Sequence, residues 1–136
     1  MNAAIPSALR RLVSQRAGHR CEYCLFPQAV ALHRHEPDHI IPHQHGGVTD
    51  ADNLALACLR CNRYKGPNVG SFDSLTGQLT PLFHPRRQSW EHHFQMVGAE
   101  IQPLTPEGRV TVRLLHLNDP ARLAERQSLI EAGLFW

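Results

Sequence analysis

The sequence contains no run of 18 apolar residues, and its first residues, MNAAIPSALRRLV, lack a long apolar stretch. We therefore expect no transmembrane helix, no secretory signal and a cytoplasmic location. Lysine is nearly absent, because 13 of the 14 basic side chains are arginines and the exception is Lys65. The formal net charge is only +2, which excludes a uniformly basic, histone-like protein.

The four cysteines, in contrast, follow a strict pattern. They form two C-x-x-C pairs, Cys21 with Cys24 and Cys58 with Cys61, separated by 33 residues. A disulfide framework would need an oxidising compartment, and a redox C-x-x-C motif usually occurs once in a chain. Two such pairs can instead converge on one tetrahedral ion, so the spacing favours a structural zinc site with four cysteine ligands.

In this chain of 136 residues, helically spaced apolar residues and short apolar runs predict a mixture of helices and short strands, an α+β protein. Two short strands are expected around the loop between the cysteine pairs, and residues 67–89 are expected to form an ordered but irregular connection. Glycine and proline positions set the other limits. We expect strands at residues 29–35 and 54–57, a hairpin of 90–97 with 99–104, and helices at 7–18, after Cys58, from Pro106 and from Pro120.

Several short motifs follow one another in a fixed order between residues 15 and 70. After the first cysteine pair come Asp38-His39-Ile40-Ile41-Pro42, then Gly46-Gly47, Asn53-Leu54, and finally Cys61-Asn62 with Lys65-Gly66. This ordered set resembles the HNH endonucleases, which have the ββα-metal nuclease fold. The resemblance implies an α+β, ββα-metal core that is stabilised by a zinc site of four cysteines, preceded by a helix and followed by a hairpin and two helices. It divides the chain into a nuclease module (1–70) and a C-terminal extension packed on it (71–136).

The resemblance also implies a role for each motif residue in phosphodiester hydrolysis. His39 is expected to be the general base, and Asp38 and Asn62 are expected to hold the catalytic cation. Asn53 is expected to pin the loop that aims His39, and Lys65 to contact phosphate or the leaving group. Many family members have histidine at the position of Asn62, and an amide oxygen there favours Mg²⁺ or Mn²⁺ over softer metals.

Arginine near the second cysteine pair indicates where nucleic acid is expected to bind. Arg60 and Arg63 flank Cys61, and together with Lys65 they form the expected contact surface. The expected partner is duplex DNA, with RNA as the alternative, and no membrane or small-molecule cofactor is expected. Two other functions stay open: a non-catalytic zinc module that binds nucleic acid, and a zinc-stabilised protein-interaction domain.

Overall fold

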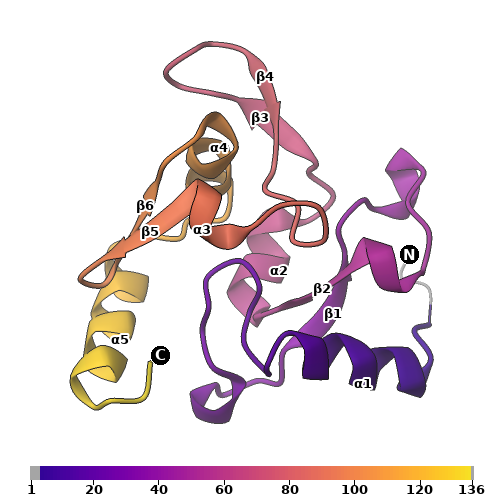
Figure 1. Ribbon diagram of the computed structural model, residues 1–136, viewed down its shortest axis with the longest axis horizontal. Coiled ribbons are helices and arrows are strands. Elements are labelled where there is room, and N and C mark those ends of the chain that lie inside the picture. Colours follow the sequence, from indigo (N-terminus) through magenta and orange to yellow (C-terminus); the bar gives the residue numbers. More distant parts are fainter. Residues whose placement is uncertain (1–3, 136) are drawn as a thin grey trace.

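The computed structural model describes residues 4–135 as short helices and small antiparallel sheets, an α+β architecture (Figure 1). Each sheet in the described part has two strands: β1 with β2, β3 with β4, and β5 with β6. The elements are, in chain order, α1 (Ser7–Arg16), η1 (Gln28–Val30), β1 (Glu36–His39), η2 (His43–His45), η3 (Ala51–Asn53), β2 (Leu54–Ala57), α2 (Leu59–Lys65), β3 (Gly70–Phe72), β4 (Leu79–Pro81), α3 (Trp90–His93), β5 (Phe94–Val97), β6 (Glu100–Pro103), α4 (Pro106–Leu114) and α5 (Pro120–Glu131).

Strand β2 is buried on both faces, although its sheet has only two strands. Successive side chains of a strand point to opposite faces. Leu54 and Leu56 pack with Val13 of α1 on one face. Ala55 and Ala57 belong to the main core on the other face, where their small side chains let the cysteine pairs approach. The LALA sequence therefore joins α1 to the rest of the protein.

The C-terminal extension shares one hydrophobic core with the cysteine-bearing segment. Leu82, Phe83, Phe94 and Ile101 of the extension lie in the same buried cluster as the four cysteines. Trp90 adds a polar contact, because its indole Nε1 donates a hydrogen bond of 3.0 Å to a backbone carbonyl of the first cysteine turn. The boundary at residue 70 stays a prediction, but the two parts are packed together.

The predicted strand at residues 29–35 is wrong. That segment begins with η1 and continues as an irregular loop, and β1 starts at Glu36. The cause is local, because the backbone N–H of His35 donates to Gln28 Oε1 and its ring Nε2 bonds to the Phe26 carbonyl. Pro37 is tolerated inside β1 because each strand of a two-stranded sheet has one open edge.

Residues 67–89 also differ from the expectation, because they contain the β3–β4 hairpin. The three-residue strands are too short to give a readable alternation in sequence. The turn between them is fixed by Asp73, whose carboxylate accepts hydrogen bonds of 2.7 and 2.9 Å from Arg109 on α4. These hydrogen bonds hold the pKa of Asp73 well below its usual range.

The hairpin predicted for residues 90–97 with 99–104 is confirmed only in part, because Trp90–His93 form the short helix α3 and the strands are Phe94–Val97 and Glu100–Pro103. The predicted helices and the strand at residues 54–57 are confirmed. Helix α2 ends at Lys65 and is capped by Gly66, whose φ is 48°, and β5 pairs with β6 across Gly98, whose φ is 58°. Prolines occupy the first positions of α4 and α5, as their fixed φ favours. No helix in residues 4–135 has the length and hydropathy required to cross a bilayer.

Candidate metal centre and active site

The four cysteine sulfurs form one buried cluster. Their Sγ atoms all lie within 4.8 Å of one another, and Cys24 Sγ is 3.6 Å from Cys58 Sγ. Four thiolates around a tetrahedral zinc with bonds of about 2.3 Å would be separated by about 3.8 Å, so the donor set fits this ion. Within residues 4–135, no other group of three or more Cys, His, Asp or Glu side chains converges in this way. The cluster suggests a structural zinc site.

Backbone and side-chain donors surround these sulfurs. The N–H groups of Cys24 and Cys61 point at Cys21 Sγ and Cys58 Sγ, at 3.5 and 3.4 Å. Arg122 of α5 also reaches the cluster, with Nη2 3.2 Å from Cys61 Sγ. Burial lowers the pKa of Arg122, but the charges of Cys61, Cys24 and Cys58 and the hydrogen bond to Cys61 together raise it by more, so the net shift is upward.

Next to the metal centre, a buried ion pair links β1 to α2. Lys65 Nζ lies 3.0 Å from Asp38 Oδ2 and donates a hydrogen bond of 2.9 Å to the backbone carbonyl of His39. Lys65 is only 1% exposed. Burial raises the pKa of Asp38, and the charge of Lys65 opposes that shift. A lysine that contacts phosphate must face solvent, and Lys65 does not. It instead connects α2 to β1.

His39 ends β1 with its imidazole partly exposed and held at one nitrogen. Nε2 lies 2.8 Å from Thr49 Oγ1, and no hydrogen bond within residues 4–135 involves Nδ1. The ring of His43 lies beside it, with ring centroids 4.8 Å apart. Burial and, secondarily, the charge of His43 lower the pKa of His39, which keeps its ring neutral to a lower pH than an isolated histidine.

The loop that follows His39 is tied to the start of β2 by one amide side chain. Asn53 Oδ1 accepts a hydrogen bond from the Ile41 N–H, and its Nδ2 donates to the Ile41 and Val48 carbonyls, all at 2.9 Å. Gly47 makes this closure possible, because a Cβ at that position would overlap the Ile41 carbonyl. These are the contacts expected of a residue that pins the loop.

Asn62 lies on α2 directly after Cys61 and three residues before Lys65. Residues three apart on a helix share a face, so Asn62 lies on the face of α2 whose lysine contacts Asp38. Its side chain is half-buried and makes no hydrogen bond within the described residues. The Asn62 amide therefore has no hydrogen-bond partner among the described residues, and the cation site predicted for it and Asp38 stays a prediction.

The two arginines of the expected nucleic-acid surface differ from each other. Arg60 forms an ion pair of 3.0 Å with Glu125 on α5, and both side chains are nearly half exposed. Arg63 is exposed, and none of the ion pairs between described residues includes it. Of the two, Arg63 is the cation whose charge is available to a phosphate.

The structure adds three residues that sequence reasoning did not assign: Thr49, Gly47 in its packing role, and Arg122. A Gly-Gly pair beside a histidine is a signal for close backbone approach, so Gly47 could have been assigned this role. Thr49 and Arg122 carry no such signal, because the site residues that they contact, His39 and Cys61, lie 10 and 61 residues away along the chain.

The hairpin of β1 and β2, followed by α2 and anchored by the cysteine cluster, defines a ββα module with a histidine at its strand end. Residues 21–68 match the family model described as HNH endonuclease. No curated protein and no solved structure matched the chain.

Proposed function

We propose that the protein is a metal-dependent endonuclease that hydrolyses phosphodiester bonds in DNA, with His39 as general base. The observation that carries this proposal is the environment of His39 in an HNH-family segment. One ring nitrogen is held by Thr49, and the other has no partner within the described residues. A neutral imidazole positioned in this way can accept a proton from water.

Thr49 has a positioning role in this proposal. If Nε2–H donates to Thr49 Oγ1, the lone pair of the imidazole is on Nδ1, and this nitrogen takes the proton of the attacking water. The backbone around His39 is fixed from two sides. Asn53 ties the following loop to β2, and Lys65 bonds to the His39 carbonyl. A fixed base reduces the reorganisation needed before the proton moves.

The carboxylate of Asp38 and the amide oxygen of Asn62 are the residues that would hold the catalytic Mg²⁺ or Mn²⁺. Magnesium is usually bound by one or two carboxylates together with water and substrate oxygens, so a site with few protein ligands suits it. When bound, such a cation neutralises charge on the phosphoryl oxygens and the leaving oxygen. Asp38 Oδ2 lies 3.0 Å from Lys65 Nζ, and this buried oxygen has no well-directed hydrogen bond from any described residue.

Lys65 receives a different role from the one that the sequence predicts. Its ammonium group is buried between Asp38 and the His39 carbonyl, so it is a positioning residue for both. Its positive charge opposes the rise in the pKa of Asp38 that burial causes, and so favours the ionised carboxylate that would bind a cation. We assign the contact with phosphate to Arg63 instead, because Arg63 lies on the exposed side of α2.

The wild-type protein with supercoiled plasmid tests the proposal. We expect relaxation and then linearisation of the plasmid with Mg²⁺ or Mn²⁺, and none with EDTA. A matched single-stranded RNA substrate tests the choice of nucleic acid. If plasmid is bound but stays supercoiled with every divalent cation, the protein is a non-catalytic zinc-dependent binding module.

A further inference from the structure

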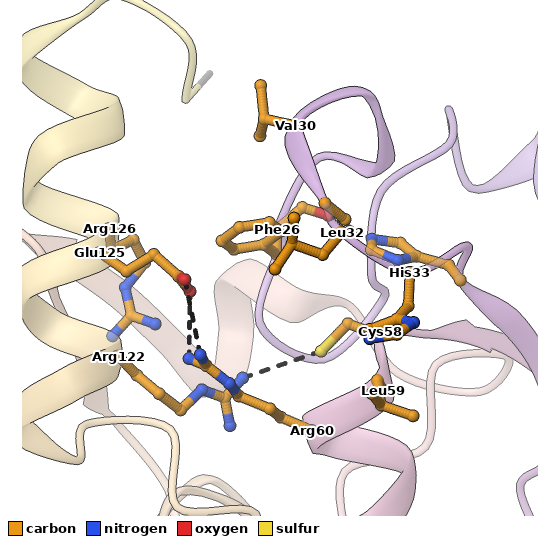
Figure 2. Close-up of a pocket in the computed structure, with 12 residues that line it drawn as sticks. Phe26, Val30, Leu32, His33, Cys58, Leu59, Arg60, Arg122, Glu125 and Arg126 are labelled. Atoms are coloured by element: carbon orange, nitrogen blue, oxygen red, sulfur yellow. Dashed lines mark hydrogen bonds and ion pairs between the residues drawn. The ribbon is translucent and has the colours of Figure 1, made fainter.

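The C-terminal extension places one buried cation against the cysteine cluster. Arg122 lies on α5, outside the segment 21–68, and its Nη2 is 3.2 Å from Cys61 Sγ and 3.9 Å from Cys58 Sγ. The arginine is only 6% exposed. Figure 2 shows its side chain extending from α5 toward Cys58, and both residues line the same pocket.

The other half of the guanidinium group is fixed by backbone. Nη1 donates to the Leu115 carbonyl at 2.8 Å and lies 3.4 Å from the His116 carbonyl, just after α4. The planar guanidinium group is therefore held in one orientation, with Nη1 toward the carbonyls and Nη2 toward the sulfurs. Such preorganisation is what distinguishes arginine from a flexible lysine.

The charge at the cluster explains why an arginine lies there. A zinc ion with four thiolates carries a net charge of −2, and an uncompensated charge is costly in a buried site. Hydrogen bonds from a cation to an ionised acceptor are about twice as strong as neutral ones. Groups that bond to the ligands of a metal tune the affinity of the site, and their loss typically costs about 10–100-fold.

We infer that the metal centre of this protein extends beyond its four cysteines to Arg122, a positioning residue that α5 supplies to the thiolates of Cys61 and Cys58. The inference rests on zinc binding by the cysteine cluster and not on nuclease activity. It makes the extension part of the zinc centre, so the HNH segment alone lacks a component of its own metal site.

The same helix provides a matched control. Arg126 lies about one turn after Arg122 and is only 2% exposed. Its guanidinium donates to the carbonyls of Ala99 and Leu117 and to Asn118 Oδ1, and to no sulfur within the described residues. Replacing Arg126 weakens the docking of α5 without removing a sulfur contact, whereas replacing Arg122 removes both kinds of contact.

The experiment uses the full chain as wild type, Arg122→Gln, Arg122→Lys and Arg126→Gln. Zinc content is measured first, followed by zinc affinity from competition with a chromogenic chelator. The Co²⁺-substituted proteins report the sulfur-to-metal charge-transfer band. We expect one zinc per wild-type chain and an affinity about 10–100-fold lower in Arg122→Gln. The zinc affinity of Arg126→Gln should lie within about threefold of the wild-type affinity, and its Co²⁺ spectrum should match that of wild type.

A second readout follows the sulfurs themselves. A guanidinium hydrogen bond withdraws electron density from a thiolate, so zinc release by an alkylating reagent should be faster in Arg122→Gln than in Arg126→Gln. Arg122→Lys keeps the positive charge but lacks the planar guanidinium group, so its zinc affinity should be intermediate. This variant tests the inference if Arg122→Gln does not fold. Equal effects of the Arg122 and Arg126 replacements, or an Arg122→Lys protein equal to wild type in affinity and spectrum, would overturn the inference. A wild-type protein without zinc would also overturn the inference. The nuclease proposal is tested separately, by the plasmid assay.

Discussion

Lys65 Nζ lies 3.0 Å from Asp38 Oδ2, so the last residue of α2 and an aspartate of β1 form a buried ion pair. The same ammonium bonds to the carbonyl of His39. One side chain thus sets the distance between the helix that carries Asn62 and the strand that carries Asp38 and His39. In the proposed mechanism, this contact fixes the separation of the two cation-binding side chains.

Replacing Lys65 with methionine should destabilise the fold by about 3–5 kcal/mol, because it leaves a buried carboxylate without its charge partner. Urea denaturation measures this loss. Arg63→Met on the exposed side of α2 is the control, and it should change the free energy of unfolding by no more than about 0.5 kcal/mol. Adding Asp38→Asn to Lys65→Met should recover part of the stability. A Lys65→Met protein that is as stable as Arg63→Met but does not bind DNA would contradict this role and would show that Lys65 contacts phosphate.

Gly47→Ala should destabilise the protein by about 1–3 kcal/mol and lower any nuclease activity, because the new Cβ would overlap the Ile41 carbonyl and displace Asn53. The neighbouring Gly46 has a φ of 90° and open space around it, so Gly46→Ala should cost only about 1 kcal/mol through backbone strain. Thermal unfolding of both variants gives the comparison. A Gly47→Ala protein that is less affected than Gly46→Ala would contradict the close approach of this loop.

Much of this region could be predicted from sequence, because its features are local or ordered along the chain. The cysteine pairs and the position of Asn53 follow from the order and spacing of motifs, and the strand at Leu54 follows from a short apolar run. The start of β1 could not be predicted, because hydrogen bonds from His35 to Gln28 and Phe26 close residues 26–35 into a loop. The burial of Lys65 is also a tertiary effect, since it depends on how α2 packs across the hairpin.

In the C-terminal extension, the sequence predicts secondary structure but not the roles of individual residues. Its hairpin across Gly98 and its proline-initiated helices were readable from turn and capping residues. The role of Arg122 was not, because an arginine on an amphipathic helix usually faces solvent. Only the packing of α5 against the cysteine cluster buries it beside Cys61.

DNA affinity should weaken as salt increases, and Arg63→Ala should reduce the slope of log affinity against log salt by about 1. Arg60→Ala should change it less, because Arg60 is already paired with Glu125. Fluorescence anisotropy with a labelled duplex over a salt series measures both slopes. Glu125→Gln frees Arg60 and should strengthen binding. A slope unchanged in Arg63→Ala would move the DNA surface away from α2.

The rate of cleavage should rise with pH and reach half of its maximum below about pH 6.5, because a general base acts in its neutral form and the pKa of His39 is lowered by burial and by His43. His43→Asn removes one cause of the lowering, so its midpoint should move to higher pH. Initial rates of plasmid nicking from about pH 5 to about pH 8.5, at saturating Mn²⁺, give both profiles. A His43→Asn midpoint at lower pH than that of wild type would contradict the electrostatic link between the two rings.

The most direct test of the central claim compares His39→Ala with wild type in plasmid nicking at matched metal and pH. His92→Ala is the control, because His92 is exposed on α3 and its side chain makes no hydrogen bond within residues 4–135. His39→Ala should keep its fold, its zinc and its DNA affinity but nick about 10²–10⁴-fold more slowly, since a general base contributes that range. His92→Ala should match wild type. A His39→Ala protein that nicks as fast as wild type would contradict the assignment of His39 as the base.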